Sequence, residues 1–182
     1  MVTRSFGAAI ALGGNLGDSQ RILSEAIAVI NQALNIDVTA RSHFYRTAPV
    51  GPPQPDYINA CVLVETGLSP IALMHQLLSI ENQFGRVRQA RWGARSLDLD
   101  LLFYGDRTLD ILGLTVPHPR LHERPFVLVP LMDIAPNWQH PILHQTTEQL
   151  LAQQSTAGVE RLSLRFSPKE TSPMPTPQKI TP

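Results

Sequence analysis

Along this chain the spacing of apolar residues alternates between that of a strand and that of a helix. The order of these segments limits the fold more than any other feature. Residues 6–12 form an apolar run of strand length. After Asp18 or Ser19, either of which can cap a helix, apolar residues recur at helical spacing up to Leu34. Residues 36–45 then have the β-branched and aromatic content of a strand. The first part of the chain therefore predicts a strand, a helix and a second strand.

The same three elements repeat in the next part. Residues 47–56 hold four prolines and a glycine and are predicted to be a loop, which leads into a strand at residues 58–65. Pro70 opens a second helical pattern that ends near Gly85, and residues 96–104 alternate as a strand. The order β-α-β-β-α-β predicts the α+β class, with helices on one face of a mainly antiparallel sheet.

The remaining segments are predicted to be additions to this core. Residues 108–112 are expected to form a short strand, and residues 124–134 and 147–154 to form helices. Residues 167–182 contain five prolines together with Ser, Thr and Lys, a composition typical of disorder. We therefore expect one domain over residues 1–166 and a Pro-rich disordered tail.

Composition excludes several classes of function. The 182 residues carry 15 basic and 15 acidic side chains, so the chain lacks the charge of a general nucleic-acid binder. No apolar run reaches the length of a membrane span, and no signal peptide is evident. The single Cys61 excludes an internal disulfide and fits a reducing compartment, so we expect a cytoplasmic protein without nucleic-acid or membrane partners.

The motif with the clearest chemistry is Asp98-Leu99-Asp100. Residues two apart on a strand share a face, so both carboxylates project together with their Cα atoms about 6.6–7 Å apart. Leu97, Leu99 and Leu101 then point to the opposite face and can enter the core. Paired carboxylates suit Mg²⁺, which takes one or two of them together with substrate phosphates. The alternative is a solvent-facing strand whose polar side happens to be acidic.

A cluster of arginines precedes this diacid: Arg86, Arg88, Arg91 and Arg95. Arginine binds phosphate oxygens in a bidentate manner, and Mg²⁺ bridges phosphates to carboxylates, so the pair of features predicts a nucleotide polyphosphate site. The chain has 13 Arg, and its two Lys lie in the last fourteen residues. No P-loop motif is present, so a P-loop enzyme is excluded. A solvated basic loop is the alternative.

A second group of residues offers apolar and aromatic surface together with one amide. An asparagine can donate and accept at the edge of a heterocycle, and aromatic faces suit a flat bicyclic ring. The alternative is that the aromatic members are ordinary core residues. The group consists of Pro49, Val50, Tyr57, Asn59, Trp92 and Phe126.

Over about residues 9–136 the chain resembles the 6-hydroxymethyl-7,8-dihydropterin pyrophosphokinases of the folate pathway. The resemblance rests on the segments AIALGGNLGD, FYRTAPVGPPQPDYINACVLVET, IENQFGRVRQARWGARSLDLDLLFYGD and LTVPHPRLHERPFVLVPLMDIAP. It implies a ferredoxin-like core and transfer of the β,γ-pyrophosphoryl group of ATP to the pterin hydroxymethyl oxygen, with release of AMP. The substrates would be two small molecules, and we expect a monomer.

The resemblance also implies roles for individual residues. Asp98 and Asp100 would hold two Mg²⁺ ions and, with Arg86 and Arg95, form the catalytic group. The implied ATP-binding positions are Glu81, Arg86, Arg88, Arg91, Arg95, Leu101, Thr115, His118 and Arg124. The implied pterin-binding positions are Thr47, Pro49, Val50, Tyr57, Asn59, Trp92 and Phe126. Gly13 and Asn15 match the first turn beneath the site.

The chain departs from some members of this family. Gln89 stands where a lysine is common, the loop is one residue shorter before Arg91, and Pro119 replaces an aromatic residue beside the adenine.

Two other functions share parts of the pattern. RNA-recognition domains use the same element order but need exposed aromatics on the central strands, and a metal-dependent phosphohydrolase could use the same diacid.

Overall fold

The structure is a computed structural model, and it describes residues 5–49, 52–85 and 93–163. Several of the residues named above lie outside the described residues. They are Val50, Arg86, Arg88, Gln89, Arg91, Trp92 and the predicted tail, residues 167–182.

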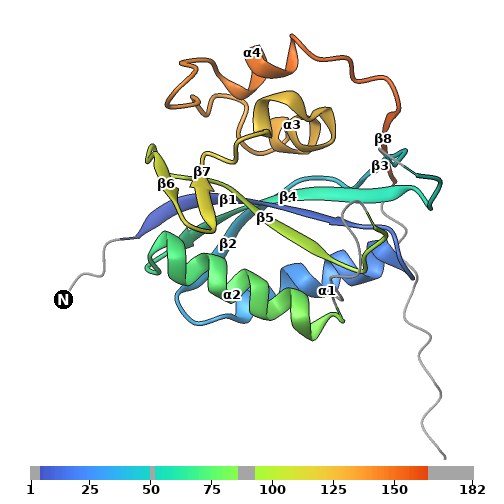
Figure 1. Cartoon of the computed structure of the whole chain (residues 1–182), viewed down its shortest axis with the longest axis horizontal. Helices are drawn as coiled ribbons and strands as arrows, with labels where there is room; N and C mark the ends of the chain where they lie inside the picture. Colours follow the sequence, from blue (N-terminus) through green and yellow to red (C-terminus); the bar gives the residue numbers. More distant parts are fainter. Residues whose placement is uncertain (1–4, 50–51, 86–92, 164–182) are drawn as a thin grey trace, which may run out of the picture.

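The centre of the fold is one six-stranded antiparallel sheet (Figure 1). Its order is β5-β1-β4-β3-β8, and β2 also pairs with β4. Every pairing in it among the described residues is antiparallel, in agreement with the mainly antiparallel sheet that was predicted. The strands are β1 (Phe6–Gly14), β2 (Ile36–Arg41), β3 (Tyr45–Thr47), β4 (Tyr57–Thr66), β5 (Asp98–Tyr104) and β8 (Val159–Arg161).

Helices cover both faces of this sheet (Figure 1). The predicted core helices, α1 (Ser19–Gln32) and α2 (Pro70–Gln83), lie together on one face. The C-terminal additions, α3 (Pro125–Met132) and α4 (Thr147–Leu151), lie on the other. The placement of α1 and α2 on one face is as predicted, whereas the sequence pattern did not assign α3 and α4 to the opposite face. The molecule is therefore a three-layer arrangement.

The two core helices begin where the sequence predicts. The Asp18 carboxylate accepts a hydrogen bond from the Arg21 N–H, and the Ser69 hydroxyl accepts one from the Ala72 N–H. Pro70 occupies the first turn of α2, where its missing N–H leaves no bond unmade. These caps satisfy backbone donors that no preceding turn can bond.

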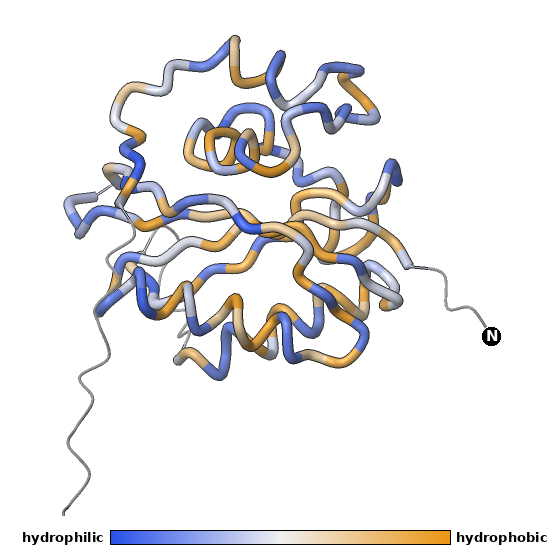
Figure 2. Tube along the Cα trace, turned by 180° about the vertical axis from the view of Figure 1, so that it is seen from behind, coloured by the Kyte–Doolittle hydropathy of each residue, from blue (hydrophilic) through white to orange (hydrophobic). Residues whose placement is uncertain are grey.

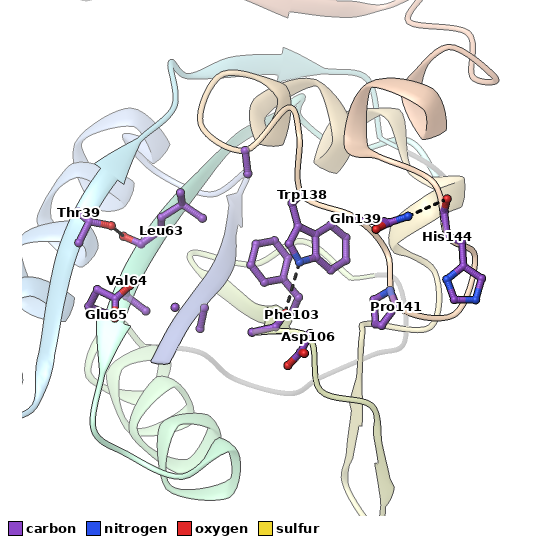
Figure 3. A pocket seen from close by; sticks show the side chains of 14 residues that line it. Thr39, Leu63, Val64, Glu65, Phe103, Asp106, Trp138, Gln139, Pro141 and His144 are labelled. Carbon is purple, nitrogen blue, oxygen red and sulfur yellow. Dashed lines mark hydrogen bonds between the residues drawn. The ribbon is translucent and has the colours of Figure 1, made fainter. Parts of the chain in front are cut away.

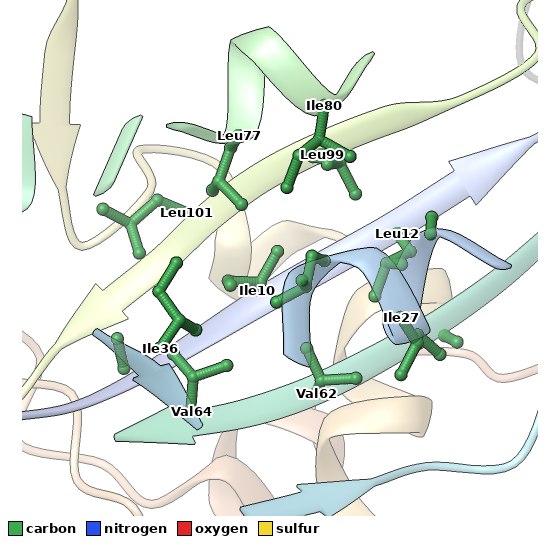
Figure 4. Close-up of a cluster of buried hydrophobic side chains, with 14 of the residues drawn as sticks. Ile10, Leu12, Ile27, Ile36, Val62, Val64, Leu77, Ile80, Leu99 and Leu101 are labelled. Carbon is green, nitrogen blue, oxygen red and sulfur yellow. The ribbon is translucent and has the colours of Figure 1, made fainter. Parts of the chain in front are cut away.

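Apolar side chains fill the space between these helices and the sheet (Figure 4). Leu23 and Ile30 of α1 and Leu77 of α2 are fully buried against strand residues such as Ile10. Burying each such side chain stabilises the fold by about 1.5–3 kcal/mol. The hydropathy-coloured trace shows apolar residues concentrated on the sheet and on the inner sides of the helices (Figure 2).

Strand β5 changes its alternation part-way along. Leu99 and Leu101 face the α1–α2 core, as predicted. A bulge opposite Ala9 and Ile10 shifts the register, and Leu102 and Phe103 both join the second apolar cluster beneath α3. Before the bulge, the strand keeps its strict two-residue period. Asp98 and Asp100 therefore lie on the α3 face of the sheet.

Helix α3 is tied to the sheet by the carboxylate of Asp133. It accepts hydrogen bonds from the Tyr45 hydroxyl at 3.0 Å and from both the backbone N–H and the ring Nδ1 of His43 at 2.9 Å. Burial, followed by the bond to Asp133, raises the pKa of Tyr45 to about 12. Arg161 contacts the other ring nitrogen of His43, so the contact extends to β8.

Differences from the sequence expectations fall mainly on short elements. Residues 36–45 form two strands instead of one, because the chain leaves the sheet after Arg41 and returns at Tyr45. Strand β1 continues through Gly13 and Gly14, two residues beyond the apolar run that predicted it. The predicted short strand is β6 (Leu109–Ile111), which pairs with β7 (Leu114–Val116) in a separate hairpin. Neither β7 nor β8 was predicted.

Candidate active site

A cavity of about 470 Å³ opens on the α3 face of the sheet, where β1 ends and β5 begins. Its floor comes from β1, β4 and β5, and one wall comes from the segment that leads into α3. Nine of the predicted site residues line it: Thr47, Tyr57, Asn59, Arg95, Asp98, Asp100, His118, Arg124 and Phe126. Residues more than 75 positions apart in the chain thus meet in one place.

Sheet register explains why the floor of the cavity is open. Asp98 pairs with Gly13, and Gly13 pairs with Asn59, so these three lie in one row across the sheet. The next row on the same face places Asp100 beside Ala11. A Cβ atom on Gly13 would lie 3.3 Å from the Asn59 Oδ1, which is a close contact. Small residues on β1 therefore leave space between the two carboxylates and the amide.

Asp98 is paired with the last arginine of the predicted cluster. Arg95 Nη1 donates to Asp98 Oδ2 at 2.8 Å, a short, charge-assisted hydrogen bond. Both side chains are about one-quarter exposed, so the pair can still be reached from the cavity. The guanidinium is thus held at the boundary between the carboxylates and the open space.

Asp100 faces two further groups from the opposite wall. Its Oδ2 lies 3.6 Å from Arg124 Nη1 and 3.9 Å from His118 Nε2. The backbone N–H of Arg120 donates to His118 Nδ1 at 3.1 Å, so the neutral ring carries its hydrogen on Nε2. Burial, and to a smaller extent the nearby arginines, lowers the pKa of His118, although Asp100 opposes the shift. The uncharged ring therefore presents a donor to the cavity.

The other end of the cavity is less charged. Asn59 Nδ2 donates to Thr47 Oγ1 at 2.8 Å, and both residues are buried. Tyr57 and Phe126 also line this end. The Arg124 guanidinium lies 5.7 Å from the centre of the Phe126 ring, which joins this end to the charged one. An amide and aromatic side chains in one cavity are suited to a flat polar ring.

Four described residues from the predicted site do not line the cavity. Leu101 faces the α1–α2 core because it alternates with Asp100 along β5 (Figure 4). Glu81 is buried at the end of α2, where its Oε1 accepts the Leu99 N–H at 2.7 Å. The hydroxyl of Thr115 donates to Asp110 on the β6–β7 hairpin. Pro49 lies beside the cavity lining and is not part of it.

The cavity also contains residues that the sequence did not single out. The charged ones are Arg120 and Glu123, whose side chains pair at 3.3 Å and are about half exposed. The sequence feature that could have indicated them is a pair of opposite charges, three positions apart, in the segment between His118 and Arg124. Ala48, Pro125 and Val127 add apolar surface, which no spacing in the sequence distinguishes from core.

A second hollow, of about 550 Å³, lies toward the other end of the same sheet face (Figure 3). Trp138 and Phe103 stack there with ring centres 4.1 Å apart, and the Trp138 indole donates to the Gly105 carbonyl. Among the described residues that line it are none of the predicted site residues. The first cavity is therefore the candidate active site.

Comparisons with known proteins agree on one family. The sequence model of the family described as 7,8-dihydro-6-hydroxymethylpterin-pyrophosphokinase (HPPK) matches residues 9–136. A 2-amino-4-hydroxy-6-hydroxymethyldihydropteridine pyrophosphokinase from Synechocystis sp. is 50% identical over 153 residues, which cover 84% of this chain and 78% of that protein. The protein of the same name from Haemophilus influenzae is 48% identical, over 69% of this chain and 79% of its own length.

Solved structures agree on the fold. The crystal structure of Plasmodium falciparum HPPK-DHPS with pteroate matches with a TM-score of 0.67 at 14% identity, over 82% of this chain. This chain spans 42% of that longer chain, so the likeness concerns one part of it. At this level of identity the match establishes the ferredoxin-like fold alone.

Proposed function

The chain belongs to the 7,8-dihydro-6-hydroxymethylpterin-pyrophosphokinase family, and from this premise we propose that the cavity between β5 and α3 is its active site. The chain is an ATP-dependent pyrophosphokinase of folate biosynthesis, with ATP as co-substrate. The observation that carries the assignment of the site is a pair of same-face carboxylates, each next to an arginine, on the floor of a cavity that the Asn59 amide also lines.

The reaction joins two small molecules in one transfer. The hydroxymethyl oxygen of 6-hydroxymethyl-7,8-dihydropterin bonds to the β-phosphorus of ATP. The bond from that phosphorus to the oxygen shared with the α-phosphate breaks, AMP leaves with that oxygen, and the proton of the hydroxyl group is released. Catalysis of such transfers consists mostly of positioning and charge stabilisation, so the protein needs to place two substrates and a set of charges.

The charged end of the cavity suits the polyphosphate of ATP. Arg95 and Arg124 provide fixed guanidinium groups, and His118 provides a neutral Nε2–H donor. We assign the triphosphate to this end because arginine forks match phosphate oxygens. Arg86, Arg88 and Arg91 complete the proposed ATP site, with Arg86 in the catalytic group. On the resemblance alone, we also assign three residues to the nucleotide side: Glu81, Leu101 and Thr115. Glu81 and Leu101 would act there through the backbone of β5, since neither side chain lines the cavity.

The chemistry of the donor set fits Mg²⁺. Asp98 and Asp100 offer carboxylate oxygens on one face, and the described residues contain no cluster of three or more His, Cys, Asp or Glu that would form a complete protein cage. Two carboxylates that share a cation with substrate phosphates are the usual arrangement for this ion. We propose that these aspartates hold two Mg²⁺ ions. When bound, Mg²⁺ supplies neutralisation of phosphate charge and a lower pKa for the attacking hydroxyl.

The amide-lined end suits the pterin. We propose that Asn59 pairs with an edge of the heterocycle while Tyr57 and Phe126 contact its faces. Thr47 supports the Asn59 amide through its hydroxyl. Pro49, Val50 and Trp92 complete the proposed pterin-binding group. A pterin bound in this way would have its hydroxymethyl group near the carboxylates, since Asp98, Gly13 and Asn59 occupy one row of the sheet.

We further propose that the protein is a monomer in the cytoplasm, a compartment that its single, buried Cys61 fits. We assign residues 1–166 to a single catalytic domain and residues 167–182 to a tail outside it. In the part of the chain that the structure describes, no helix is long and apolar enough to cross a membrane.

Release of AMP tests the proposed function directly. The full chain is incubated with ATP and Mg²⁺, with and without 6-hydroxymethyl-7,8-dihydropterin, and AMP and free phosphate are both measured. We expect AMP in equal amount to pyrophosphorylated pterin, and none without pterin. Release of free phosphate that does not depend on pterin would contradict the assignment and indicate a phosphohydrolase.

A further inference from the structure

The second hollow, which lies away from the candidate active site, is lined largely by aromatic and aliphatic side chains (Figure 3). Trp138 is stacked on the buried ring of Phe103. Leu63, Ala135 and Pro141 add aliphatic surface around the two rings. Surfaces of this kind bind the apolar part of an extended peptide.

Exposed apolar residues continue from the hollow onto the surface of the molecule. Ile142 and Leu143 directly follow Pro141, which lines the hollow, and are 60% and 39% exposed. Isolated exposed apolar residues are common on proteins, but a group of them beside a hollow marks an interaction surface. The hollow and this rim together are therefore a candidate docking surface.

The charge of the hollow is negative. Glu65 and Asp106 line it and are exposed, and the described residues that line it include no lysine or arginine. Asp37 on β2 pairs with Glu65 in the sheet, so a third carboxylate lies beside the hollow on the same face. Like charges at paired positions destabilise a sheet, and a cation placed beside them relieves the repulsion. The hollow thus favours a segment that is apolar and also carries positive charge.

The C-terminal segment of this chain, residues 164–182, has the complementary composition, and it lies outside the described residues. It contains both lysines of the protein, Lys169 and Lys179, and three alternate prolines in residues 173–177. Proline fixes its backbone near the polyproline II conformation, and proline-rich segments bind in this form to grooves lined by aromatic side chains. A composition typical of disorder is compatible with docking, since such segments become ordered when they bind.

This segment starts near the hollow. The Leu162 N–H, just before it, donates to the Phe44 carbonyl at 2.8 Å. Thr39 lines the hollow and comes five residues before Phe44, so their Cα atoms are at most about 18 Å apart. The chain therefore leaves the described structure within a short distance of the hollow.

The direction and length of the chain also fit. Strand β8 runs in the same direction as β4, because both are antiparallel to β3, and β4 leads toward Glu65. Residues 164–172 span about 28 Å in the polyproline II conformation, which rises about 3.1 Å per residue. This span exceeds the distance from Phe44 to the edge of the hollow, so the prolines that begin at Pro173 can reach it.

We propose that the C-terminal segment of the same chain docks in the second hollow. Residues 173–177 pack on the ring of Trp138, and the Lys179 ammonium group faces Glu65 and Asp106. The contact is intramolecular, because a short connection holds the segment at a high effective concentration and a weak contact then suffices. The docked segment covers apolar surface that is otherwise open to solvent.

A fluorescent label on the C-terminal segment tests this proposal in the full chain. Cys61 is fully buried, so a thiol-reactive bimane attaches to the Thr176→Cys variant at position 176, and mass spectrometry confirms a single label. Contact with a tryptophan quenches bimane emission. We expect Trp138→Phe in the labelled chain to raise the emission at least about twofold, because the effective concentration keeps the segment mostly docked. Trp92 is present in both chains, so the difference reports on Trp138.

Variants of the carboxylates then test the charge. Glu65→Gln removes a carboxylate that faces Lys179, so the emission should rise part of the way, and adding Asp106→Asn should raise it further. Glu25→Gln is the matched control, since Glu25 is exposed on α1 at the opposite face of the sheet (Figure 1). This control should leave the emission unchanged.

Each outcome decides the proposal, and thermal melting shows whether each variant folds. Emission that is the same with and without Trp138→Phe overturns it, as would be found if another molecule occupied the hollow. If Trp138→Phe does not fold, higher emission in the chain with Glu65→Gln and Asp106→Asn supports the proposal, and unchanged emission overturns it. Quenching that grows with protein concentration also overturns it, because the hollow would then receive the segment of a second copy.

Discussion

The two faces of one sheet differ in what the same strands present. On the α1–α2 face, strand residues such as Leu99 and Leu101 complete a continuous apolar core. On the α3 face, the same strand presents Asp98 and Asp100, and apolar packing starts beyond the bulge. The α1–α2 face therefore stabilises the fold, whereas part of the α3 face forms the cavity of the candidate active site. Substitutions at adjacent positions should separate the two roles.

The largest effect is expected at the carboxylates. Asp98→Ala or Asp100→Ala removes a proposed metal ligand, so we expect kcat to fall by at least about a thousandfold, the upper end of losses for a key charge-stabilising group. The melting temperature should stay close to that of the unmodified chain, because both side chains are partly exposed. A variant that keeps full activity in Mg²⁺ would refute the proposed diacid site.

Leu99→Ala is the matching substitution on the other face. It truncates a fully buried side chain between the two aspartates, so we expect a loss of about 2–5 kcal/mol in the free energy of unfolding. Turnover per folded molecule should change little. Urea unfolding followed by circular dichroism measures the first quantity, and activity corrected for the folded fraction measures the second. Unchanged stability would mean that this face is not packed as described.

Arg95→Ala should have a smaller effect on turnover than loss of a carboxylate. The guanidinium contributes one set of donors to the phosphates, and other cations remain in the cavity, so we expect kcat to fall by about ten- to a hundredfold. Steady-state kinetics with both substrates measures the change. An increase confined to the KM for pterin would place Arg95 outside the phosphate site.

The smallest effect concerns the attachment of α3 to the sheet. Burial raises the pKa of Asp133, but hydrogen bonds from His43 and Tyr45 outweigh it and lower the pKa below the ordinary 3.8. A lowered pKa stabilises the fold above pH 3.8, and this contribution is lost as the pH falls through the pKa of the folded state.

Asp133→Asn should therefore reduce stability at pH 7 by roughly 1 kcal/mol, the usual net value of a hydrogen bond, and should reduce it less at pH values well below 3.8. Urea unfolding of both proteins across this range measures the difference. A difference that does not depend on pH would show that the Asp133 charge plays no part in holding α3.

Much of this could be predicted from the sequence, because the signals are local. The two-residue period of β5 placed Asp98 and Asp100 together and Leu99 opposite them, and Asp18 and Ser69 marked the helix starts. Residue types alone singled out six of the nine predicted residues that the fold brings into one cavity, and the resemblance to a family added Thr47, His118 and Arg124. Short strands were missed, since a three-residue segment such as β8 pairs only because β3 lies beside it.

Sequence alone determined the order of the long core elements, the face on which each residue of β5 lies before the bulge, and the family, because each depends on residue identity over a short range. Tertiary structure decided which cation meets which carboxylate: Arg95 meets Asp98, and Arg124 meets Asp100. It also decided that Trp138 stacks on Phe103 in a second hollow. These contacts depend on sheet register and on the packing of distant segments, which no local spacing encodes.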